Sequence, residues 1–126
     1  MSLTEDRAIE TLYGLGHWLL EQHRPADAEH VFRTLLMSAP HDERSWLGLG
    51  MCHEQRGETA TAGRLYSLAE SAVPQSFRCP LARARVMRLQ NTPELAQQSY
   101  EMAEERALAI DEGEIAAAIS AERCSL

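Results

Sequence analysis

The pattern of apolar, small and aromatic residues repeats along the chain with a period of 34 residues. The first copy comprises Leu12, Leu15, Gly16, Leu19, Ala28, Phe32, Leu35 and Pro40. Adding 34 to each number gives Trp46, Leu49, Gly50, His53, Ala62, Tyr66, Ala69 and Pro74. A third copy keeps the second half of the pattern and drifts in the first half: Pro80, Arg83, Ala84, Met87, Ala96, Tyr100, Ala103 and Leu108. Such self-similarity indicates a stack of like structural units.

The pattern predicts helices and no strand. We expect them over residues 4–22, 26–38, 42–55, 59–72, 79–90, 93–108 and 112–122. Thr4, Asp42 and Thr92 are candidate N-caps. Proline is tolerated in a first helical turn, which suits Pro80 and Pro93.

The repeated small residues have a packing role. Gly16, Gly50 and Ala84 are predicted to lie where the two helices of one unit approach closely. Pro40 and Pro74 are expected to end the second helix of a unit, because proline disfavours helix in the residue before it and lacks an N–H.

The last helix is predicted to begin at Asp111, with Glu114 three residues later in a variant of the capping box. One face of it carries Ile115, Ala118, Ile119 and Glu122 and is only half apolar. A terminal helix that covers the last unit and shows a polar side to water has this character.

This pattern resembles the tetratricopeptide repeat, a 34-residue unit of two antiparallel helices, A and B. The resemblance implies an all-α fold of a single domain, residues 1–126. Three repeats, 9–42, 43–76 and 77–110, would stack as a right-handed superhelix, followed by a C-terminal capping helix, 111–123.

Composition and charge narrow the function classes. The chain has 126 residues, 44% hydrophobic and 25% charged, which suits one globular domain. Its net charge of −7 argues against nucleic acid as a partner. No apolar run approaches the roughly 20 residues that span a bilayer, and the acidic N-terminus lacks the apolar core of a secretory signal. Three widely spaced cysteines are expected to be free thiols in a reducing cytoplasm.

In the resembled repeat the A helices line a concave groove. Carried over by position, the groove residues are Tyr13, His17, Leu20, Leu47, Met51, Leu81, Arg85 and Arg88. A largely apolar floor of this kind suits an extended peptide, and Arg85 and Arg88 could grip its carbonyls or acidic side chains. Alternatively, the apolar residues pack against neighbours or a terminal segment. A lysine-based clamp for a C-terminal carboxylate is excluded, since the chain has no lysine.

Residues 9–110 are similar, more narrowly, to the class II chaperones of bacterial type III secretion, which guard translocator proteins. The third repeat, SFRCPLARARVMRLQ, carries the most specific feature, an entry with Phe77 and Pro80. This resemblance implies a non-enzymatic cytoplasmic chaperone with a role in virulence. Its partner would be an extended segment of a secreted translocator, and the family is compatible with a homodimer. The alternative is a general repeat scaffold that mediates assembly of a protein complex.

Other chemistry has little support. We expect no catalytic residue, metal or cofactor, because the five histidines form no metal-binding spacing and Cys52 and Cys79 lack a paired base. The carboxylates of the last third are interpreted as a solvated face. The arginines between 78 and 88 either grip an acidic ligand or offset acidic neighbours.

Overall fold

The computed structural model describes residues 3–125, which form seven helices and no strand. The helices are α1 (Leu3–Glu21), α2 (Pro25–Ser38), α3 (Glu43–Gln55), α4 (Thr59–Ala72), α5 (Arg78–Leu89), α6 (Pro93–Ala109) and α7 (Gly113–Arg123). The predicted all-α class is confirmed, and every predicted helix end lies within one residue of the observed one.

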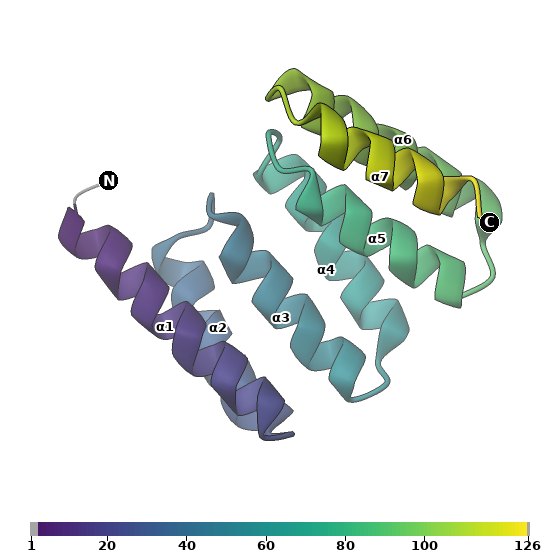
Figure 1. Ribbon diagram of the computed structural model, residues 1–126. Helices are drawn as coiled ribbons and strands as arrows, with labels where there is room; N and C mark the ends of the chain where they lie inside the picture. Colours follow the sequence, from purple (N-terminus) through teal and green to yellow (C-terminus); the bar gives the residue numbers. More distant parts are fainter. Residues whose placement is uncertain (1–2, 126) are drawn as a thin grey trace.

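The helices form two layers. The A-type helices α1, α3, α5 and α7 lie in front in Figure 1, and α2, α4 and α6 lie behind them. Each helix packs against the next one in the chain, while α3 also contacts α1 and α5 within the front layer. The front layer therefore forms one continuous surface built from side chains of successive repeats.

Aromatic residues of the rear layer pack between neighbouring front helices. A Cβ atom on either Gly16 of α1 or Gly48 of α3 would overlap the ring of Phe32 from α2. Gly50 is opposite Tyr66 in the same way. The role predicted for Gly16 and Gly50 is confirmed, and Gly48 adds a second contact, between one repeat and the next.

The turns from A helix to B helix share one backbone conformation. His23, Gly57 and Asn91 stand 34 residues apart and have φ values of 57°, 77° and 60°. The N–H of the following residue donates back to the end of the A helix, as from Glu58 N to the His53 carbonyl oxygen at 2.8 Å. This left-handed residue with its backward bond is a common helix end, and it makes the hairpins tight.

The predicted N-caps fare differently. Asp42 caps α3, because its side chain accepts from Arg44 N at 3.0 Å. Thr4 lies inside α1 and is not a cap. Thr92 precedes α6, but its hydroxyl donates to the Met87 carbonyl oxygen at 2.9 Å and so satisfies the end of α5 instead.

The predicted start of the last helix needs two corrections. Asp111 has a φ of 59° and belongs to the turn that ends α6, so it forms no capping box with Glu114. The buried residues of α7 are Ala116 and Ile119, whereas Ala118 is exposed. Ala118 occupies the same repeat position as Gly16 and Gly50, whose side faces the B helix of their own repeat. Among the described residues, no B helix follows α7 to cover Ala118.

Candidate binding groove

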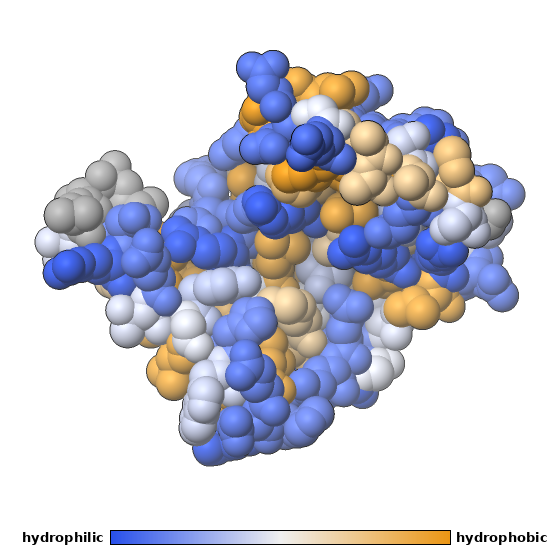
Figure 2. Space-filling view, viewed as in Figure 1, coloured by the Kyte–Doolittle hydropathy of each residue, from blue (hydrophilic) through white to orange (hydrophobic). Residues whose placement is uncertain are grey.

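The front layer contains a hollow of about 540 Å³, which we call the central hollow. Figure 2 shows hydrophobic side chains deep in the middle of this face with hydrophilic ones around them. Its lining comes from all four front helices, from α4 and from the residue that precedes α5: Tyr13, Leu47, Met51, Glu54, Tyr66, Phe77, Arg78, Leu81, Ala82, Arg85 and Ile115.

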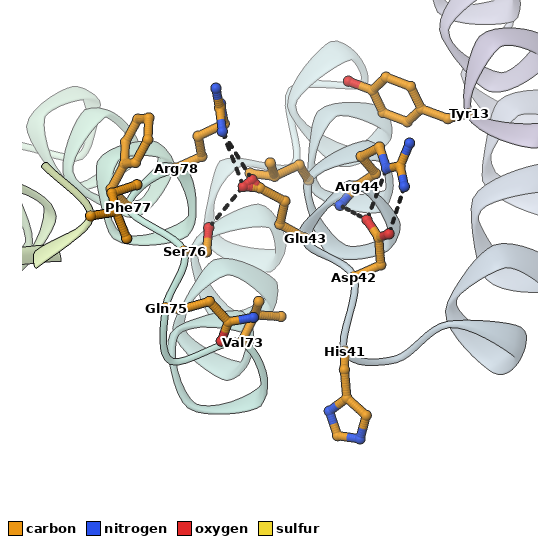
Figure 3. Close-up of a pocket in the computed structure, with 12 residues that line it drawn as sticks. Tyr13, His41, Asp42, Glu43, Arg44, Val73, Gln75, Ser76, Phe77 and Arg78 are labelled. Atoms are coloured by element: carbon orange, nitrogen blue, oxygen red, sulfur yellow. Dashed lines mark hydrogen bonds and ion pairs between the residues drawn. The ribbon is translucent and has the colours of Figure 1, made fainter. Parts of the chain in front are cut away.

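A second hollow of about 630 Å³ adjoins the first, near the turns that precede α3 and α5. We call it the loop-side hollow. Its polar lining includes Asp42, Glu43, Arg44 and Ser76 (Figure 3). Tyr13, Leu47, Phe77 and Arg78 line both hollows. The two hollows are therefore parts of one groove.

One repeat position supplies much of the central floor. Tyr13, Leu47, Leu81 and Ile115 stand 34 residues apart, are half-buried and line the central hollow. Ile115 was missed by the sequence reasoning, although adding 34 to Leu81 identifies it. Tyr66 was missed because its position indicates packing between layers, and Phe77 was missed because it was interpreted only as the entry of the third repeat.

Five of the eight predicted groove residues meet at the central hollow: Tyr13, Leu47, Met51, Leu81 and Arg85. The His17 ring lies 5.4 Å from the Tyr13 ring, measured between centroids, but outside both linings.

Two predicted residues need correction. Leu20 is buried in the N-terminal core with 8% of its surface exposed, so its side chain does not line the groove. Arg88 is engaged elsewhere, because its Nη2 donates to the Ser125 carbonyl oxygen at 3.2 Å and to the Ser125 hydroxyl at 3.0 Å.

The arginines that line the hollows are paired within the chain. Arg44 contacts Asp42 at 2.7 Å, and Arg78 contacts Glu43 at 3.3 Å, as Figure 3 shows. Arg85 donates to both carboxylate oxygens of Glu122, at 3.0 and 2.9 Å. Of the two sequence interpretations of the arginine cluster, these contacts favour arginines that offset acidic neighbours.

These pairs hold the groove charges in fixed states. The hydrogen bond from Arg44 lowers the pKa of Asp42, and the hydrogen bond from Arg85 lowers the pKa of Glu122. Burial raises the pKa of the Tyr13 phenol, so that it stays protonated and available as a donor. The surface therefore offers an apolar floor beside which these charges are paired.

The thiols of Cys52 and Cys79 are not activated as nucleophiles. Burial raises the pKa of the Cys52 thiol to about 11 and also raises that of Cys79, which keeps both protonated at neutral pH. Within residues 3–125, no group of three or more His, Cys, Asp or Glu side chains is arranged to hold a metal ion. In the same range, no helix is long and apolar enough to cross a membrane.

Comparison with known sequences identifies the repeat. The family model described as tetratricopeptide repeat matches residues 13–77. A comparison with curated proteins gives no match.

Solved structures of two chaperones share the fold. The translocator chaperone SycD of Yersinia enterocolitica superposes with a TM-score of 0.83 at 23% identity, covering 96% of this chain and 91% of SycD. PcrH from Pseudomonas aeruginosa superposes with a TM-score of 0.81 at 25% identity, covering 99% and 93%. PcrH in complex with the chaperone binding region of PopD gives a TM-score of 0.79 at 26% identity, covering 95% and 91%.

Proposed function

The chain belongs to the tetratricopeptide repeat family, and we propose that it is a cytoplasmic, non-enzymatic chaperone for a translocator of type III secretion. It binds an extended segment of this client in the groove formed by the two hollows. The observation that carries the proposal is the continuous apolar floor that four successive repeat positions create. The likeness to PcrH, solved with the chaperone binding region of PopD, supports the choice of client.

The groove suits an extended segment rather than a compact surface. Its floor residues come from four parallel front helices, so a chain that crosses them meets one apolar contact after another. Each apolar side chain that a client buries there contributes roughly 1.5–3 kcal/mol. Met51 adds an unbranched side chain that adapts to ligands of different shape.

Binding of this kind accounts for a chaperone function that needs no covalent chemistry. A translocator segment that is apolar enough to enter a membrane aggregates in water, and covering it in the groove keeps the client soluble and away from premature partners.

Self-association of the chain stays a prediction. The front helix α1 leaves Leu15 and Trp18 exposed at 45% and 50%. These side chains support contact with a second copy.

Co-expression with a hydrophobic protein encoded by a neighbouring gene tests the proposal. We expect that protein to be soluble and to co-purify with the wild-type chain, and to be insoluble when expressed alone. A neighbouring protein that stays insoluble in both cases contradicts the chaperone function. One that is folded and soluble by itself yet still binds supports a scaffold instead.

A further inference from the structure

At two places in the chain, a tyrosine of the rear layer donates its hydroxyl to a glutamate of a front helix. The Tyr66 hydroxyl donates to Glu54 Oε2 at 2.5 Å, and the Tyr100 hydroxyl donates to Glu122 Oε2 at 2.7 Å. The two glutamates hold the same repeat position, two periods apart, on front helices. Tyr66 belongs to the same hairpin as Glu54, whereas Tyr100 belongs to the hairpin before Glu122. The glutamates can therefore be compared through the front helix that precedes each of them.

The pair at Glu122 is complete. Arg85, on the neighbouring front helix α5, donates Nε and Nη2 to the two oxygens of this carboxylate. Glu122 thus receives a hydroxyl and a planar guanidinium at the same time, which is the geometry of a strong charge-assisted contact.

The pair at Glu54 lacks its cation. Arg85 precedes Glu122 by 37 residues, and the residue at the same distance before Glu54 is His17 of α1. His17 is paired with Glu21 instead, at 3.6 Å. Within residues 3–125, no arginine or histidine forms an ion pair with Glu54. Arg85 lines the same hollow and senses the charge of Glu54 from a longer distance, but its guanidinium is paired with Glu122. Within residues 3–125 the Glu54 side chain accepts one hydrogen bond, from Tyr66 to Oε2, which leaves Oε1 for another donor.

Glu54 also differs from the other carboxylates of the groove. Among the described lining residues, Asp42 is neutralised by Arg44 and Glu43 by Arg78. Glu54 lines the central hollow near the apolar side chains of Met51 and Leu81. A partly buried carboxylate without a cation favours a ligand that brings one.

We propose that Glu54 selects clients that carry an arginine or lysine next to the apolar residues filling the central hollow. The client cation takes at Glu54 the place that Arg85 takes at Glu122. Arginine fits best, because its fork can reproduce the two-nitrogen contact. A client carboxylate at the same point is repelled. This selection rests on the proposed function, since it refines what the groove binds.

Peptide selection on the full chain tests the role of Glu54. A phage library of random 12-residue peptides is selected against the wild type, Glu54→Gln and Glu105→Gln. The control removes the same charge from an exposed residue outside both hollows. We expect the wild type and the control to enrich arginine or lysine beside apolar residues, and Glu54→Gln to enrich apolar peptides without that preference.

A double-mutant cycle with the best basic peptide quantifies the contact. Glu54→Gln should weaken its affinity about tenfold, the scale of a charged hydrogen bond. Replacing the basic residue of the peptide by glutamine should cause the same loss in the wild type and no further loss in Glu54→Gln. Glutamine retains an acceptor for Tyr66, and circular dichroism verifies that the helices are intact.

The outcomes separate the two proposals. Peptides that depend on Leu47 and Met51 but show no basic preference, or that keep the preference on Glu54→Gln, overturn the role of Glu54 alone. A selection in which no peptide depends on Leu47 and Met51 overturns the groove function itself.

Discussion

Phe32 lies between two front helices because a glycine stands opposite its ring on each of them. Gly16 belongs to the same repeat as Phe32, whereas Gly48 belongs to the next. Gly14 holds the register of Gly48 one repeat earlier, and a Cβ there would meet nothing within 4 Å. Adding a side chain is therefore expected to destabilise the fold at Gly48 and to be tolerated at Gly14.

Alanine at each glycine tests this packing. Gly48→Ala should lower the free energy of unfolding by about 1–3 kcal/mol, because the ring of Phe32 must move. Gly14→Ala should raise it by about 0.5–1 kcal/mol, because alanine is the better helix former and space is available. Urea unfolding measures both, and shifts in the same direction would contradict the account.

Sequence reasoning reached the contacts within a repeat more easily than those between repeats. The period predicted that Gly16 and Gly50 lie where the two helices of one hairpin approach closely, and the structure places the aromatic residue of that hairpin opposite each of them. It did not single out Gly48, whose partner comes from the preceding hairpin. Leu20 was misplaced in the groove because its apolar side chain at a groove position packs into the N-terminal core instead.

At the scale of elements, α7 behaves as the A helix of a fourth repeat. It packs against α6, buries Ala116 and Ile119, and points Ile115 into the central hollow. Side-chain hydrogen bonds hold its C-terminal end in place, since Glu122 accepts from Arg85 of the front layer and from Tyr100 of the rear layer. Sequence analysis predicted the helix but not these partners, because periodicity within a helix cannot show which distant arginine a carboxylate will meet.

The pairing of Glu122 predicts a pH-dependent contribution to stability. Its pKa is below the ordinary glutamate value of 4.5, chiefly through the hydrogen bond from Arg85. The deprotonated form is therefore favoured by folding, and the contribution is complete above that value and lost as the pH falls through the lower folded value.

Thermal unfolding of Glu122→Gln measures this contribution. At pH 7 the variant should melt about 2–5 °C below the wild type, and the difference should shrink at about pH 3. Glu105→Gln, at an exposed position of α6, serves as the control and should change little. An equal difference at both pH values would show that Glu122 acts through packing rather than charge.

At the scale of the whole molecule, the groove arises from repetition. One A helix contributes a single half-buried side chain at this repeat position, and the four front helices together form the apolar floor. The sequence predicted most of this floor because the 34-residue period carries it. The period does not encode two further features. The pairing of Arg85 with Glu122 depends on how the last helix packs against the front layer, and the loop-side hollow depends on the turns that precede α3 and α5.

The central claim is that this groove binds the client, and the affinity of groove variants for it tests that most directly. Calorimetry would use the translocator segment recovered by co-expression, titrated into the wild type and into Leu47→Glu/Met51→Glu. Two unpaired charges on the apolar floor should weaken binding by about 100-fold or more, with helical circular dichroism unchanged. The control Met37→Glu/Leu68→Glu alters residues that are 87% and 59% exposed outside both hollows, and it should bind as the wild type does. Wild-type affinity in the groove variant would contradict the account.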